Sequence, residues 1–171
     1  MKTILSALDF SPISKAVFSA SLDLAKTYGA KLYLLHVIHN LQDVYIGFSL
    51  ASQEYYGSMG PMYVPDEDLV NQLRERAKAE EEELSGMQKQ AAAQGVDCEA
   101  LLLQGDVARV IKDEISRLSV DTCVIGTHGH GIFYKALLGS TSESIIEHCG
   151  CPLMLIPAGY GETRKNSEDK T

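Results

Sequence analysis

Five short apolar segments alternate with four segments of helical periodicity along this chain of 171 residues. The apolar segments span residues 3–8, 32–38, 98–103, 121–125 and 152–156, and the helical ones about 11–29, 64–94, 106–118 and 140–148. Strands that alternate with helices indicate a parallel sheet with right-handed crossovers. We therefore predict an α/β fold: a single doubly wound domain, Rossmann-like, with a five-stranded parallel sheet and helices on both faces.

Two segments do not follow this alternation. Residues 40–63 hold four of the eight tyrosines, and irregular stretches of this length are often functional or disordered. Residues 159–171 are polar. We predict one domain over residues 1–158, with an aromatic insertion at about 40–63, followed by a flexible tail at 159–171. The insertion is expected to cover its own domain or a neighbouring subunit, with a substrate lid as the alternative.

Residues with known capping preferences mark the helix ends. Ser11 and Pro12 suit the N-cap and first position of the first helix, and Asp106 suits the N-cap of the third. Gly29 and Gly95 follow the first two helices, where glycine commonly ends a helix. The run Glu80–Glu83 is expected to form a solvated helix face.

A glycine-rich loop follows the fourth apolar segment. It reads Gly126-Thr-His-Gly-His-Gly131, and Gly139-Ser-Thr141 follows at the start of the last helix. Glycines let backbone N–H groups approach an anion, and a helix N-terminus adds unpaired donors and partial positive charge. This spacing predicts a phosphate site, with a ligand-free tight turn as the alternative.

The end of the first strand supplies a second candidate. Ligands of doubly wound sheets bind outside the carboxyl ends of the strands, where the strand order reverses. Asp9 ends the first strand and Gly126 follows the fourth. If these two strands are neighbours, both residues meet at one crevice. Asp9 is expected to contact a ligand, with capping of the following helix as the alternative.

Composition excludes several classes of partner. The formal net charge is −8, which argues against a duplex nucleic-acid surface, because such surfaces need clustered Lys and Arg. No apolar run approaches the length of a membrane span, and the N-terminus does not resemble a signal peptide. We predict a cytoplasmic protein with no nucleic-acid or membrane partner.

The sequence favours neither a metal centre nor a nucleophile. The cluster His148-Cys149-Gly150-Cys151 offers only three metal ligands, so a structural role is preferred to a zinc site. Ser11, Ser140 and Ser142 have no partner arrangement that suggests a serine nucleophile. We therefore predict no catalytic residue and no metal-ligating residue.

Over about residues 2–157 the chain resembles the universal stress protein family, specifically its nucleotide-binding branch. The resemblance rests on Asp9, on Leu35-His36-Val37, on Gln104-Gly105-Asp106, on Gly126-Thr-His-Gly129 with Gly139-Ser140, and on the ending at residues 148–156. It implies an adenine nucleotide, ATP or AMP, with an associated Mg²⁺ or Mn²⁺ ion. It also implies a homodimer joined through the edge strand Leu153–Ile156.

The resemblance also implies a role for individual residues. Asp9 would accept hydrogen bonds near the base or ribose, and the backbone of Val37 would meet the adenine ring. Ile125 and Gly126 would flank the ribose and the first phosphate. The phosphates would be enclosed by Gly129, His130, Gly139, Ser140 and Thr141. The family frequently has arginine at position 130, so histidine predicts weaker or pH-dependent phosphate binding.

These observations favour a stress-response protein that acts as a nucleotide sensor or regulator. The phosphate loop has no positioned general base or arginine finger beside it in the sequence pattern. Two alternatives stay open: a slow ATP-hydrolysing enzyme assisted by His128 or His130, and an interaction module whose segment Tyr45–Tyr63 docks onto a partner protein.

Overall fold

The computed structural model describes residues 1–38, 67–127, 145, 149–157 and 160. The predicted insertion, most of the glycine-rich loop and the tail apart from Tyr160 lie outside the described residues. In chain order the described elements are β1 (Thr3–Leu8), α1 (Ser14–Tyr28), β2 (Lys31–Ile38), α3 (Glu67–Ala93), β3 (Cys98–Gln104), α4 (Val107–Arg117), β4 (Thr122–Gly126) and β5 (Leu153–Ile156).

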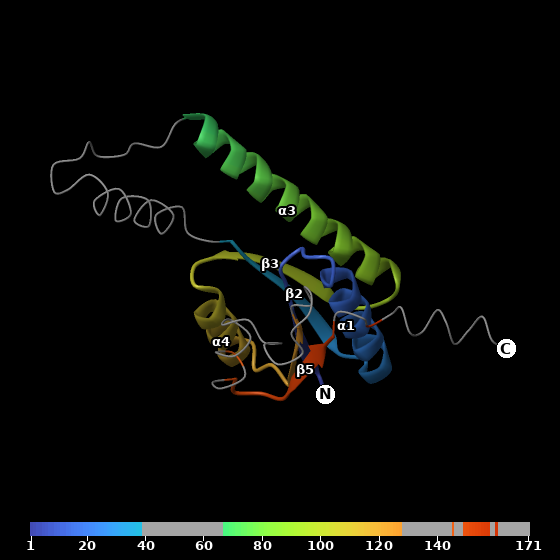
Figure 1. Ribbon diagram of the computed structural model, residues 1–171. Coiled ribbons are helices and arrows are strands. Elements are labelled where there is room, and N and C mark those ends of the chain that lie inside the picture. Colours follow the sequence, from blue (N-terminus) through green and yellow to red (C-terminus); the bar gives the residue numbers. More distant parts are fainter. Residues whose placement is uncertain (39–66, 128–144, 146–148, 158–159, 161–171) are drawn as a thin grey trace.

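The strands form one parallel sheet in the order β3-β2-β1-β4-β5. This order confirms the predicted five-stranded parallel sheet and places residues 153–156 at an edge. The central strand β1 pairs with β2 on one side and with β4 on the other, so the strand order reverses between β1 and β4. Figure 1 shows α1 and α3 beside the sheet and α4 apart from them.

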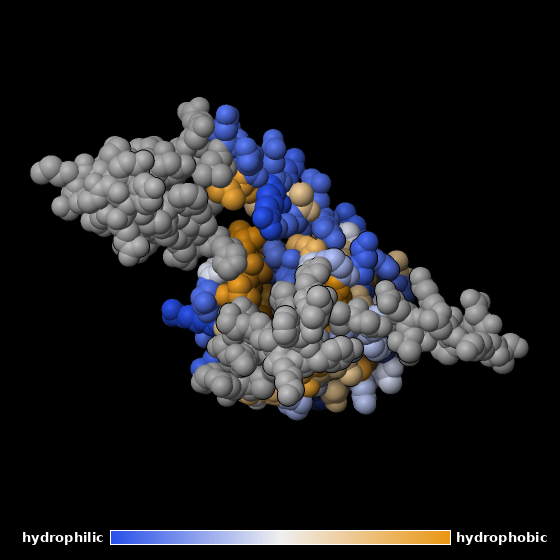
Figure 2. Space-filling view, viewed as in Figure 1, coloured by the Kyte–Doolittle hydropathy of each residue, from blue (hydrophilic) through white to orange (hydrophobic). Residues whose placement is uncertain are grey.

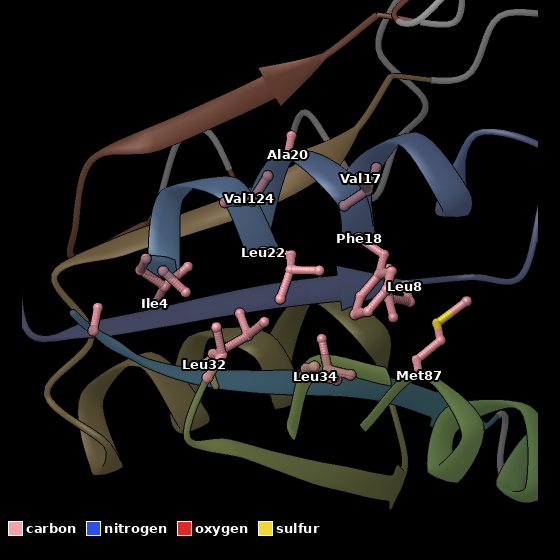
Figure 3. Packing of buried hydrophobic residues seen from close by; sticks show 14 of the residues in the cluster. Ile4, Leu8, Val17, Phe18, Ala20, Leu22, Leu32, Leu34, Met87 and Val124 are labelled. Atoms are coloured by element: carbon pink, nitrogen blue, oxygen red, sulfur yellow. The ribbon is translucent and has the colours of Figure 1, made fainter. Parts of the chain in front are cut away.

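Successive side chains along each strand point to opposite faces of the sheet, so the strands contribute to two apolar layers. Ile4 and Leu8 of β1 belong to a layer that packs against α1 and α3, as Figure 3 shows for Phe18 and Met87. Leu5 of β1 points into the second layer, which contains α4. The second layer is built from Leu5, Leu35, Val37, Ile111, Ile115, Val120, Cys123, Ile125 and Ile145. Helices therefore cover both faces, as predicted.

The caps follow the sequence at three of four positions. Gly29 has φ 59° beyond α1, Gly95 has φ 81° beyond α3, and the Asp106 carboxylate accepts a hydrogen bond from the Arg109 N–H at 2.9 Å. The predictions of Ser11 as an N-cap and of Pro12 as the first helical residue are wrong. Helix α1 begins at Ser14 after Ile13, which makes no side-chain cap. Among the helices of the described ranges, none has the length and hydrophobicity needed to cross a membrane.

Gly126 lets the end of β4 approach the start of α1. A Cβ atom built on Gly126 would lie 2.9 Å from Ile13 Cγ2 and 3.2 Å from Val17 Cγ2. Both methyl groups sit on β-branched side chains, whose rotation is restricted. A side chain at position 126 would therefore push β4 and α1 apart, at the point where the strand order reverses.

We expect Gly126→Ala to lower the free energy of unfolding by about 1–3 kcal/mol, because the added methyl group overpacks this contact. Urea unfolding measures the change. The matched control is Gly86→Ala within α3, where an added Cβ meets nothing within 4 Å; helix propensity predicts a gain of up to ~1 kcal/mol there. The Gly126→Ala cost should shrink in an Ile13→Ala background, and an equal cost in both backgrounds contradicts the steric explanation.

Candidate functional site

The carboxyl ends of β1 and β4 lie side by side, as the prediction required. β1 pairs with β4 in parallel from Ile4–Thr122 to Ser6–Val124. The chain leaves β4 at a fixed position, because the Thr127 N–H donates to Ile156 O at 2.9 Å. The glycine-rich loop therefore starts next to the strand whose end carries Asp9.

Asp9 organises a tight turn after β1. Its Oδ1 accepts hydrogen bonds from the Ser11 N–H at 3.0 Å, the Ser11 hydroxyl at 2.6 Å and the Ser14 hydroxyl at 2.8 Å. The Ser14 hydroxyl in turn accepts from the Asp9 N–H at 3.3 Å. The short Asp side chain is well suited to such a local turn. Asp9 thus holds the backbone that leads from the crevice into α1.

Phe10 adopts a strained backbone conformation within this turn. Its φ is 54°, a region that bulky L-residues rarely occupy. The Phe10 ring lies against the His36 ring, with centroids 4.4 Å apart and planes inclined by 50°. Backbone strain beside a strand-end crevice is a feature that clusters at ligand sites.

His36 connects the end of β1 to α3. Its Nδ1 lies 2.7 Å from Leu8 O, and because a carbonyl can only accept, Nδ1 carries a proton and donates. Its Nε2 lies 3.2 Å from Glu80 Oε2, and Glu80 Oε1 accepts from Arg76 Nε at 2.9 Å. His36 is 7% exposed. A polar chain thus runs from the strand end, through the buried ring, to the surface of α3.

A cavity of about 390 Å³ lies among these residues. It is large enough for a nucleoside-sized ligand. Figure 2 shows apolar surface beneath the hydrophilic outer face of α3. The cavity is lined by Leu8, Asp9, His36, Val37, Ile38, Leu73, Arg74, Arg76, Ala77, Glu80, Gln104 and Val107.

The structure brings together two of the predicted site residues in this cavity, Asp9 and Val37. Ile125 is 4% exposed and packs in the layer that contains α4. Gly126 ends β4 and packs against Ile13. The predicted phosphate contacts Gly129, His130, Gly139, Ser140 and Thr141 lie outside the described residues, and their roles stay predictions.

Sequence reasoning missed the wall that α3 contributes. Glu81–Glu83 are exposed, as predicted, but Glu80 is not part of that solvated face: its side chain is 16% exposed and bonds to His36. The spacing of residues along α3 could have indicated that Glu80 is largely buried. Glu80 falls on the apolar stripe of α3, which runs through positions 73, 77, 80, 84, 87 and 91 at alternating steps of four and three.

Metal-binding side chains do not converge in the described ranges. Within residues 1–38, 67–127, 145, 149–157 and 160, no three His, Cys, Asp or Glu side chains form a group that could hold a metal ion. The predicted Mg²⁺ or Mn²⁺ ion therefore has no ligand assigned among these residues, and it stays a prediction.

The fold defines a doubly wound α/β protein with a cavity at the carboxyl ends of β1 and β2, next to the strand pair where its strand order reverses. Comparison with known proteins identifies the family: residues 1–157 match the model of the universal stress protein family. The chain belongs to this family. It is 29% identical to universal stress protein YxiE of Bacillus subtilis over 154 residues, which cover 90% of this chain and 97% of that protein.

Solved structures share the fold at lower sequence identity. Universal stress protein UspA from Lactobacillus plantarum superposes with a TM-score of 0.68 at 19% identity, covering 91% of this chain and 97% of that one. A universal stress protein family member from Arabidopsis thaliana, solved with AMP bound, gives a TM-score of 0.57 at 23% identity and covers 92% of each chain.

The bond between Glu80 and His36 generates a stability prediction. We expect Glu80→Ala to lower the free energy of unfolding by about 1–3 kcal/mol, because it removes the partner of a buried ring nitrogen. The matched control is Arg76→Ala: the Arg76 side chain is 77% exposed, and such i,i+4 pairs contribute only about 0.3–0.5 kcal/mol. Urea unfolding compares them, and equal costs contradict a structural role for the Glu80–His36 bond.

Proposed function

We propose that this protein binds an adenine nucleotide, with the nucleoside end in the cavity beside Asp9 and the phosphates in the loop after β4. The observation that carries the proposal is the meeting of Asp9 and Val37 in one cavity of about 390 Å³ at the carboxyl ends of β1 and β2. Family membership supports it, as does the AMP bound to the Arabidopsis relative. The finer assignments of ATP and of Mg²⁺ or Mn²⁺ belong to the same proposal.

The chemistry of the cavity suits a nucleoside. Apolar surface for a planar base is provided by Leu8, Val37, Ile38, Leu73 and Ala77. The Asp9 carboxylate is an acceptor that matches ribose hydroxyls or an exocyclic amino group. Because β4 ends beside β1, the glycine-rich loop begins on the side of the crevice where the phosphates of such a ligand would extend.

We assign the protein a sensing or regulatory role in the stress response rather than fast catalysis. Nucleotide binding at a strand-end crevice needs only preorganised donors, whereas rapid phosphoryl transfer needs a positioned base and charge-neutralising groups as well. Phosphate release from saturating ATP is the measurement: turnover at rates typical of kinases, about 1–100 per second, would overturn this assignment.

We expect Asp9→Asn to weaken the binding of AMP and ATP by about 10- to 100-fold, the effect of losing a hydrogen bond to a charged group. Asparagine keeps one oxygen that can accept from Ser11 and Ser14, so the turn should persist, but it replaces the second carboxylate oxygen by a donor. Isothermal titration with adenosine, AMP, ATP and GTP measures the affinities.

The control for this series is Asp113→Asn, which removes a carboxylate of similar charge from the exposed face of α4. Its affinities should equal those of the unaltered protein. Binding of ATP but not adenosine would locate recognition in the phosphate loop alone. No heat with any adenine compound would overturn the proposal.

We also propose a homodimer joined through β5. This edge strand exposes Leu155 to 39%, and an apolar edge readily pairs with another chain. We expect Leu155→Lys to shift the protein from dimer to monomer in sedimentation velocity. Tyr28→Lys is the matched control, since Tyr28 is an exposed large hydrophobic residue on α1. Equal dimer fractions in all three proteins would contradict this interface.

A further inference from the structure

Two thiols face each other at the entrance to β5. Cys149 Sγ and Cys151 Sγ lie 3.6 Å apart, and both cysteines are free and half-buried. Gly150 between them stands in open space, because a Cβ built there would meet nothing within 4 Å. The other two cysteines are placed differently: Cys123 is fully buried in β4, and Cys98 lies on β3. Of the four cysteines, only Cys149 and Cys151 are shown as a close pair, and the backbone at Gly150 between them has open space around it.

Cys149 is also part of the wall of a second cavity. This cavity, of about 400 Å³, lies against α4 on the face of the sheet opposite α1 and α3. Its charged lining residues are Arg109, Lys112, Asp106 and Asp113. The cavity thus offers groups of both signs next to a thiol. That combination suits a small peptide that carries both carboxylates and an ammonium group, as glutathione does.

We propose that Cys149 and Cys151 form a redox-active dithiol that a small peptide disulfide, of the class of glutathione disulfide, converts to an intramolecular disulfide across Gly150. In the first step the Cys149 thiol loses its proton and attacks one sulfur of the peptide disulfide. The second peptide leaves as a thiolate and takes up that proton.

In the second step Cys151 loses its proton and attacks Cys149 Sγ in the mixed disulfide. The remaining peptide leaves as a thiol with that proton. The two cysteines are oxidised by two electrons, and one peptide disulfide is reduced to two peptide thiols, so atoms, protons and electrons balance.

The environments of the thiols determine the order of these steps. Burial, followed by the hydrogen bond with Cys149, raises the pKa of Cys151 well above its usual range. A thiol with a raised pKa is a poor first attacker, and Cys149 is the one that lines the cavity. The raised pKa also leaves the reduced form without a stabilised thiolate, which favours the oxidised pair at equilibrium. Burial likewise raises the pKa of Cys123, which keeps that thiol out of the exchange.

The first experiment follows the reaction in the full chain. The protein is incubated with glutathione disulfide, quenched by alkylation and analysed by intact mass and peptide mapping. We expect the unaltered protein to lose two alkylatable thiols, joined as Cys149–Cys151. Cys151→Ser should instead accumulate a glutathione adduct on Cys149, because the resolving thiol is missing, and Cys149→Ser should form no disulfide.

The matched control is Cys98→Ser, which removes another half-buried thiol and should behave like the unaltered protein. The proposal is overturned if all four thiols stay alkylatable in the unaltered protein. It is also overturned if the adduct in Cys151→Ser maps to Cys98 or Cys123, or if the disulfide joins another pair.

A second experiment tests whether the folded structure favours formation of the Cys149–Cys151 disulfide. The fraction of intramolecular disulfide is measured against the ratio of the glutathione disulfide concentration to the square of the glutathione concentration, once in buffer and once in urea. The native bend holds the sulfurs 3.6 Å apart, so the folded protein should be half-oxidised at a ratio lower by about tenfold or more. An equal or higher ratio in the folded protein overturns the proposal.

Discussion

The position of β1 between β2 and β4 is the constraint on which the rest of the structure depends. All its pairings are parallel, so the carboxyl ends of three neighbouring strands reach the same edge of the sheet. The crossover through α1 lies on one face and α4 on the other. The cavity beside Leu8 and Asp9 opens at these strand ends and is walled by α3 and by Val107, the first residue of α4. Close contact of Gly126 with Ile13 keeps β4 tight against α1 at this point.

The turn after β1 combines a structural and a proposed ligand-binding role in one carboxylate. A bulky residue such as Phe10 at φ 54° costs about 1–2 kcal/mol of backbone energy. The three hydrogen bonds accepted by Asp9 Oδ1 and the contact of Phe10 with His36 offset that cost. The two interpretations of Asp9, local turn residue and ligand contact, are therefore not exclusive. The turn fixes the carboxylate in the wall of the cavity.

Much of the fold could be predicted from local patterns. The strands are near-continuous apolar runs, and the glycine and Asp106 caps act within a few residues, so both are legible in the sequence. Ser11 is not the cap because its N–H and hydroxyl both donate to Asp9 Oδ1 in a turn that precedes the helix, which begins only at Ser14. That competition between two local hydrogen-bonding schemes cannot be resolved by residue preference alone.

The candidate site was predictable only in part, for a different reason. Asp9 and Val37 stand at strand ends, where the topology itself indicates a ligand. The wall from α3 depends on how a helix distant in sequence lies across those ends, which no local pattern specifies. Glu80 shows the difficulty: its charge and its three acidic neighbours indicate solvent, whereas its place on the apolar stripe indicates burial. Glu80 is largely buried in spite of its charge because His36 provides a hydrogen-bond partner for its carboxylate.

That polar pair contributes to the position of α3 along the sheet. A slide of one helical turn would keep the stripe on the sheet but would exchange large residues such as Leu73 for small ones such as Ala77, at a cost in packing. It would also break the bond from Glu80 to His36 and leave a buried ring nitrogen facing an aliphatic side chain. His36 is itself held by Leu8 O at the end of β1. The bonds from Glu80 to His36 and from His36 to Leu8 O thus link the part of α3 that carries Leu73 and Ala77 to the strand end that carries Asp9. The α3 wall of the proposed nucleoside site is therefore held by the same contacts, together with the packing of Leu84, Met87 and Ala91, that anchor the helix.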